Sequence, residues 1–399
     1  MSQSLRPLPR GFTLIEVMVA STLSLLVLTG AISVGVYLQR RGILEERTME
    51  AQNAGRAARD LIVPAIQRAG AGFGRARLNV GGNGAQVDQR YAVWVTTDAA
   101  FPGDATFAPP TGVYAGLISD AVEIWDADSA RAVQLATGPT CNVAPYPGSV
   151  WTGTVLCAHN VPAGGPAANS LAVVTNPAVE TACVGVVGAG ATATTIPWTA
   201  GVPGRPLPPG SVCSDPGRPD AIFGAPGVNN SLLMPLSVRS YRVNWFTGRP
   251  VLEMDPDGSA GVAAYQPMAQ DIERIKVRLG LYTPSLPNND VLFFPDVAAG
   301  QPAVDQCTNA TCWARVPGDD AGTQGVSDTG PGSARDELMR RVRLVEVLIT
   351  ARTLQADVDE VARGANGATL DEEGNPVDGF KRRHFIQRIT PRNFALSGG

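Results

Sequence analysis

The chain has 399 residues, 17% of them charged, and a formal net charge of −4. This length allows more than one domain or a single enlarged one, and the charge gives no indication of a nucleic-acid-binding surface. With 44 glycines and 32 prolines, the composition favours a loop-rich, strand-based body over a helical bundle.

The N-terminal stretch combines a short basic leader, a glycine and a long apolar run. Residues 10–16 read Arg-Gly-Phe-Thr-Leu-Ile-Glu, and residues 17–39 carry no charged side chain. This run is long enough to cross a bilayer, since a spanning helix needs about 20 apolar residues. The leader lacks the separate apolar region of an ordinary signal peptide. An isolated acid at membrane depth costs roughly 2.5–3.5 kcal/mol, which makes Glu16 a functional candidate.

Residues 11–17 resemble the processing site of type IV prepilins and of the pseudopilins of type II secretion. The resemblance implies that a prepilin peptidase cleaves between Gly11 and Phe12 and that Phe12 is N-methylated. It also implies that Glu16 pairs with the N-terminal amine of a neighbouring subunit during assembly. Such pairing relieves the cost of a buried, unpaired carboxylate and sets the axial register. The alternative, a plain signal anchor, explains neither the glycine nor the position of the acid.

The sequence predicts a leader over residues 1–11, a transmembrane and assembly helix over 12–70, and a periplasmic β-rich head over 71–399. Pro64 is expected to kink the helix, and the glycine-rich segment 70–74 to end it. Mostly small residues recur at alternating spacings of four and three, which predicts a helix face that a sheet or another helix can approach closely. These residues are Leu44, Thr48, Ala51, Gly55, Ala58, Ile62, Ala65 and Ala69.

The head is predicted to be an antiparallel sheet, which gives an α+β fold with the helix packed on the sheet. Alternating apolar residues predict strands at 91–96, 120–126, 275–281 and 341–350, and a hairpin over 238–254. The chain closes with an arginine-flanked strand and a Pro-Arg-Asn sequence at 391–393. This succession is similar to PilW-type minor pilins and to the J-type pseudopilins of type II secretion.

A charge-poor stretch at about 132–235, here called the lobe, is predicted to be a large loop-rich insertion braced by disulfides. It contains four of the six cysteines, and pairing of sequence neighbours favours Cys141–Cys157 and Cys183–Cys213 among three connectivities. Cys307 and Cys312 suit a small disulfide loop. The lobe is either a partner-docking surface or a loop-rich elaboration without a partner.

Few residues suggest catalysis or metal binding. His159 and His384 are the only histidines, they lack zinc-ligand spacing, and no Gly-x-Ser-x-Gly elbow accompanies them. Glu253, Asp255 and Asp257 could bind calcium, but this turn lacks the full ligand series. We therefore predict no enzyme, no cofactor and no metal.

These features together predict a structural assembly protein. Arginines flank both ends of the apolar run, so the positive-inside rule is indecisive, and the even number of cysteines places the head in the periplasm. The resemblance implies a minor pilin that leaves the inner membrane for a pilus tip complex with other minor pilins, the major pilin and an adhesin. The alternatives are a minor pseudopilin of type II secretion and a membrane-anchored extracytoplasmic hydrolase.

Overall fold

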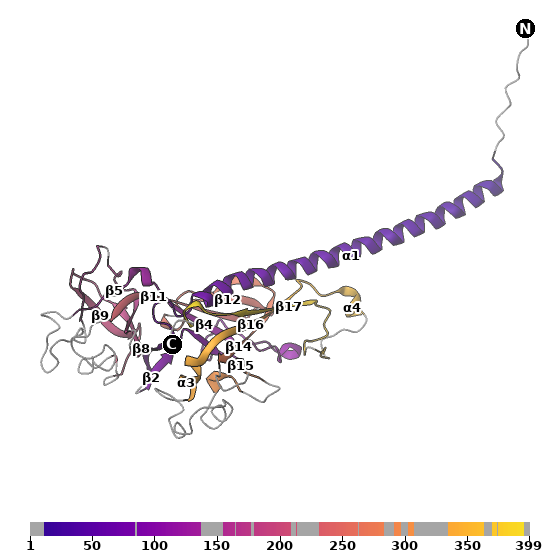
Figure 1. Ribbon diagram of the computed structural model, residues 1–399. Helices are drawn as coiled ribbons and strands as arrows, with labels where there is room; N and C mark the ends of the chain where they lie inside the picture. Colours follow the sequence, from indigo (N-terminus) through magenta and orange to yellow (C-terminus); the bar gives the residue numbers. More distant parts are fainter. Residues whose placement is uncertain are drawn as a thin grey trace, which may run out of the picture.

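A long helix projects from a β-rich head, which confirms the predicted α+β class (Figure 1). The computed structural model describes residues 12–83, 86–136, 155–163, 165–176, 179–208, 213, 231–261, 263–282, 291–296, 302–306, 334–362, 369–372 and 374–394. The long helix is α1 (Leu14–Arg68). The shorter helices are η1 (Gly112–Tyr114), η2 (Ser129–Arg131), η3 (Gly258–Ala260), η4 (Val304–Gln306), α3 (Ala334–Arg341), α4 (Val358–Ala362) and η7 (Arg392–Phe394).

The strands of the described residues form a 13-stranded and a 4-stranded sheet around one main core that also includes α1. The larger sheet contains β1 (Arg77–Asn83), β2 (Gln86–Arg90), β3 (Val93–Thr96), β4 (Ala121–Ala127), β5 (Val133–Gln134), β6 (Val155–Cys157), β7 (Leu171–Asn176), β8 (Val179–Val187), β9 (Thr195–Val202), β10 (Arg205–Pro206), β11 (Leu232–Asn244), β12 (Val251–Asp255) and β13 (Gln266–Gln270). The smaller sheet, in the spatial order β15-β14-β16-β17, contains β14 (Ile272–Tyr282), β15 (Val291–Phe294), β16 (Val342–Arg352) and β17 (Arg382–Ile389). The predicted strands 120–126, 275–281 and 341–350 correspond to β4, β14 and β16.

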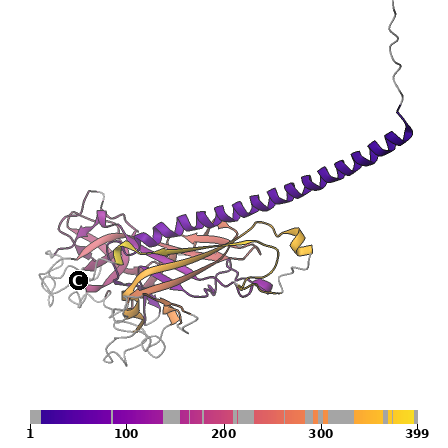
Figure 2. The same cartoon turned by 45° about the vertical axis from the view of Figure 1, so that its right-hand side comes forward.

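Only the C-terminal part of α1 packs against the head, mainly against β17 and β16 (Figures 1 and 2). Its buried residues follow the predicted stripe from Ala51 onward, whereas Leu44 is 38% exposed and lies before the contact begins. The closest approach is at Gly55, where an added Cβ would lie 2.0 Å from the ring of Phe385. Small residues on this stripe therefore let the helix approach β17 closely, as predicted.

Gly55→Ala is expected to lower the free energy of unfolding of the head by about 1–3 kcal/mol, because overpacking forces the Phe385 ring or the helix to move. The matched control is Gly42→Ala on the same helix, where nothing lies within 4 Å of the added Cβ. That change is expected to be neutral or to stabilise the helix by up to about 1 kcal/mol. Denaturant titration of the full chain in detergent, followed by tryptophan fluorescence, measures both. Equal effects of the two substitutions would contradict the packing.

Helix α1 continues through Pro64 and ends at Arg68. Pro64 has no N–H to donate to the carbonyl of Asp60, and both residues are exposed, so water can satisfy that carbonyl. The following glycines at 70, 72 and 74 have φ values of 75°, 81° and 63°, which end the helix as predicted. Asn393 donates from Nδ2 to the carbonyls of Arg68 and Ala69 at 3.2 and 3.1 Å. The end of the chain therefore returns to cap the end of α1.

Strand β11 connects the two halves of the larger sheet. Its first residues pair with β7 and its later residues pair with β4 and β12, forming the predicted hairpin through the Asn244–Val251 pair. Tyr241, Val243 and Trp245 are buried on one face, as their alternation predicts. The opposite face is buried too: Arg242 is 1% exposed, because Phe101, Phe107 and Tyr265 surround its guanidinium. Because both faces of β11 are covered here, its side chains do not alternate between buried and exposed as they do in a half-exposed strand.

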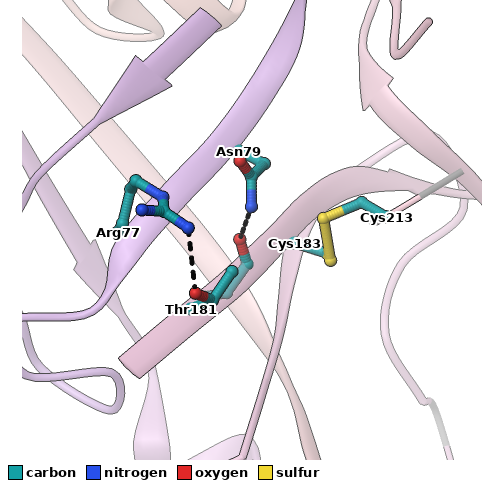
Figure 3. Close-up of a disulfide and its surroundings, with 6 residues drawn as sticks. Arg77, Asn79, Thr181, Cys183 and Cys213 are labelled. Carbon is teal, nitrogen blue, oxygen red and sulfur yellow. Dashed lines mark hydrogen bonds between the residues drawn. A yellow bond between two sulfur atoms is a disulfide. The ribbon is translucent and has the colours of Figure 1, made fainter. Parts of the chain in front are cut away.

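The lobe contains strands as well as loops, and β6–β10 extend the larger sheet beyond β11. It has a second core of its own, in which Trp198 packs over Gly185. Cys183 and Cys213 form the expected disulfide, with an S–S distance of 2.06 Å (Figure 3). Cys157 is also disulfide-bonded. The other cysteines of the prediction, Cys141, Cys307 and Cys312, lie outside the described residues.

Strand β1 joins the lobe to the segment that follows α1. It pairs in parallel with β8, through Arg77–Thr181, Leu78–Ala182 and Asn79–Cys183. Arg77 donates to the Thr181 hydroxyl and Asn79 donates to the Ala182 carbonyl, each at 3.3 Å, beside the disulfide (Figure 3). Side-chain and backbone contacts therefore attach the lobe to the rest of the head.

Candidate assembly site at the exposed half of the helix

The N-terminal half of α1 is an apolar helix that contacts no other described part of the chain. Phe12 is 87% exposed, Leu14 80% and Leu26 70%. The helix is long and apolar enough to cross a membrane, and no residue of its most apolar stretch is buried. An exposed apolar surface of this length requires lipid or other apolar helices around it.

The hydroxyl groups of this half satisfy their hydrogen bonds within the helix. Thr29 donates to the Leu25 carbonyl at 2.7 Å and Ser33 donates to the Thr29 carbonyl at 2.8 Å. Ser21 and Thr22 bond to carbonyls of the preceding turn in the same way. Because lipid offers no hydrogen-bonding partner, this internal bonding lets the helix enter a bilayer without unsatisfied hydroxyls at these positions.

Helix α1 begins with a capping box formed by Thr13 and Glu16. The Glu16 N–H donates to Thr13 Oγ1 at 3.3 Å, while the Thr13 N–H and hydroxyl both donate to Glu16 Oε2 at 2.9 Å. Residues 13–16 read Thr-Leu-Ile-Glu, which is the Ser/Thr-x-x-Glu signature of such a box. Thr13 was not singled out in the sequence prediction, although this signature would have identified it.

The capping box changes the argument for Glu16, because the carboxylate is bonded within its own chain. The sequence argument assumed a side chain that stays unpaired until a second subunit arrives. The two hydrogen bonds that the Glu16 carboxylate accepts in the box both end on Oε2. Its other oxygen, Oε1, accepts no hydrogen bond from the residues that the structure describes. An ionised carboxylate has lone pairs on both oxygens, so Oε1 can accept a bond from an outside donor while the box stays closed.

Of the other residues that the sequence singled out, Phe12 lies at this assembly site and the two histidines do not. Gly11 is outside the described residues, and Phe12 is exposed immediately before the capping box. His159 and His384 are both exposed, the first after β6 and the second on β17, where its Nδ1 lies 3.1 Å from the Thr350 hydroxyl. These positions bring neither histidine to the assembly site.

Of the three acidic residues considered for calcium, Asp255 and Asp257 meet but Glu253 does not join them. Asp255 is 1% exposed at the end of β12 and accepts from the N–H groups of Asp257 and Ala264, each at 3.3 Å. Glu253 instead bonds Arg242 Nε at 2.9 Å. No three His, Cys, Asp or Glu side chains come together as metal ligands in the described part of the chain. Burial, with a hydrogen bond to Asp257, raises the pKa of Asp255 to about 6.

The raised pKa of Asp255 predicts a pH dependence of stability. The folded state binds the Asp255 proton more tightly than the unfolded state does. Protonation of Asp255 therefore contributes fully to the free energy of unfolding below about pH 4, and this contribution is lost as the pH rises through about 6. Asp255→Asn is therefore expected to reduce the fall in unfolding free energy between pH 4 and pH 7 by about 1–3 kcal/mol. Denaturant titrations at both pH values measure this fall. The exposed variant Asp60→Asn is the control, and an equal effect there would contradict the assignment.

The N-terminal segment matches a known family model. Residues 8–32 match the prokaryotic N-terminal methylation motif. Searches of curated proteins and of solved structures give no significant match. The motif, together with the exposed apolar helix, supports a type IV pilin-like or pseudopilin-like protein. Such an N-terminus implies processing by prepilin peptidase, assembly with other pilins and, before assembly, anchoring in the inner membrane through α1.

Proposed function

We propose that this protein is a PilW-type minor pilin of a type IV pilus, with a place in the tip complex that primes assembly and presents an adhesin. The observation that carries the proposal is the combination of the methylation motif, the capping box and an apolar helix with no cover in the described chain. That helix passes from lipid into the helical core of a filament. Its head remains outside the core, where other minor pilins bind it.

The position of the lobe supports a place at the tip. Figures 1 and 2 draw the lobe strands beyond the end of α1 that enters the head. In a filament whose helices run along the axis, the next subunit would occupy the space beyond this end of α1, which is where the lobe lies. A subunit at the end of the filament has no such neighbour, so its head can carry the lobe without a steric conflict.

Immunogold labelling of sheared filaments from cells that express an epitope-tagged chain tests the position. We expect label at one filament end only. Label along the whole shaft would contradict the tip position, and filaments without any label would contradict membership of the pilus.

Co-purification separates the pilus from type II secretion. The full chain, extracted from membranes in mild detergent, is expected to bring along other minor pilins and a tip adhesin, identified by mass spectrometry. Recovery of a secretion ATPase and an outer-membrane secretin instead would assign the chain to the pseudopilins of type II secretion. The matched control is a chain that lacks residues 12–39, since assembly partners that bind through the helix are lost from it.

A further inference from the structure

We propose that a hollow in the head is a binding site for a neutral saccharide. The hollow has a volume of about 500 Å³, within the usual range of small-molecule sites, about 300–1,000 Å³. It lies between the 99–104 loop, β4, β11, the turn from β12 to β13, and Arg205 of the lobe. Its polar lining includes Arg90, Arg205, Glu123, Ser240, Asp255 and Tyr265.

Two buried polar atoms in or beside this hollow make no hydrogen bond with the described residues. Arg90 lines the hollow, and its Nε makes no hydrogen bond, although it lies 3.7 Å from Glu123 Oε2 in an ion pair. Asp257 Oδ1 is a buried acceptor without a donor, and the Asp257 carboxylate covers Gly261 on the wall of the hollow. Buried groups of this kind are costly unless a partner satisfies them. The hydroxyl groups of a ligand could satisfy either atom, since a hydroxyl is both a donor and an acceptor.

The arginines of the lining and Asp104 are already paired with charged groups of the head, which favours an uncharged ligand. Asp255 accepts from two backbone N–H groups instead. Asp88 pairs with Arg90, and its Oδ2 also lies 3.1 Å from Arg205 Nη1. Asp104 pairs with the buried Arg242. These contacts hold the side chains in fixed positions before any ligand enters, and preorganisation of this kind favours binding.

The remaining lining suits the two surfaces of a sugar ring. The Tyr265 hydroxyl lies 3.0 Å from Ser240 Oγ, which places two hydroxyl groups side by side. Alanines 99 and 100, Phe101 and Pro102 supply an apolar wall for the C–H face. Phe101 has a φ of 44°, a left-handed conformation that is rare for a bulky residue and recurs at ligand sites.

The hollow opens on the face of the larger sheet that is turned away from α1. Tyr241 shares the main core with Ile62 and Ile66 of α1. Successive side chains of a strand point to opposite faces, so Ser240 lies on the other side, where it lines the hollow. A site on this face remains open when α1 is packed among other helices.

Isothermal titration calorimetry of the full chain, in a detergent without a sugar head group, tests the proposal. The neutral probes are glucose, galactose, mannose, N-acetylglucosamine and lactose. The charged probes are calcium chloride, inorganic phosphate and arginine. We expect at least one neutral sugar to bind and the charged probes not to bind. Absence of binding by all five sugars, or binding of a charged probe at this hollow, would overturn the proposal.

Two neighbouring alanines provide the blocking variant and its control. Ala263 is exposed and lines the hollow, whereas Ala264 is exposed and does not line it. Ala263→Trp is expected to raise the Kd for the sugar at least about tenfold, and Ala264→Trp to leave it unchanged. Tyr265→Phe, which removes only a hydroxyl, is expected to weaken binding as well. Unchanged affinity in both Ala263→Trp and Tyr265→Phe, with melting temperatures like the parent chain, would place the sugar elsewhere and overturn the assignment.

Discussion

Glu16→Ala is expected to reduce incorporation of the chain into filaments severely. The substitution removes the capping box and also removes Oε1, the oxygen that we propose bonds the amine of a neighbouring subunit. A hydrogen bond to a charged group contributes about 1.5–3 kcal/mol, so incorporation should fall by roughly 10- to 100-fold from this bond alone. Quantitative immunoblotting of sheared filaments against total cell protein measures the loss.

Two further variants separate the charge from the cap. Glu16→Gln keeps an oxygen that can accept from Thr13 but loses the negative charge, and we expect it to fail nearly as completely as alanine. Thr13→Val opens the box and keeps the carboxylate, at a cost of about 0.5–2 kcal/mol, so it should assemble at a reduced level. Mass spectrometry should show cleavage before Phe12 in all three variants. Normal assembly of Glu16→Gln would mean that the residue acts as a helix cap only.

Glu273→Ala is expected to cause the largest loss of stability in the head, up to about 3–5 kcal/mol, because it removes a carboxylate from a buried ion network and leaves the arginines of that network only partly compensated. Glu273 is 0% exposed on β14 and accepts two bonds from Arg382, at 2.6 and 2.9 Å. Arg382 also bonds Asp378 at 2.9 Å, and Arg352 lies 3.7 Å from Glu273. The ion network therefore ties β14, β16 and β17 to the loop that precedes β17.

The stability change is measured by denaturant titration of the full chain in detergent, with the far-ultraviolet circular dichroism signal as a second probe. The control is Asp60→Ala, which removes the Arg59–Asp60 pair on the exposed face of α1. Exposed pairs of this kind contribute about 0–1 kcal/mol. A loss below about 1 kcal/mol for Glu273→Ala would show that the network does not hold the smaller sheet together.

The sequence predicts the elements whose pattern is local. The small-residue stripe of α1, the hairpin around Gly248 and the alternation along β14 and β16 each depend on side chains that are neighbours along the chain. The Cys183–Cys213 pair also followed from nearness in sequence. Fold class and the packed face of the helix were therefore predictable.

Contacts between distant segments were not predictable in the same way. Arg242 reads as an exposed residue of an alternating strand until Phe101, Phe107 and Tyr265 enclose it from other segments. The lobe reads as loops because glycines, prolines and alanines surround its strands, and these strands are held by pairing within the larger sheet. The hollow is formed by segments that are far apart in the sequence, including Arg205 of the lobe, so no local signal points to it.

Electron cryomicroscopy of the assembled filament end tests the central claim, which is that Glu16 bonds the amine of another subunit. The account predicts Glu16 Oε1 within about 2.7–2.9 Å of the N-terminal nitrogen of a neighbour's Phe12, the range for a charge-assisted bond. Thr13 should remain bonded to Oε2 in the same structure. A filament in which the carboxylate keeps only its Thr13 bonds, while the neighbouring amines lie in contact with water or with other groups, would contradict the account.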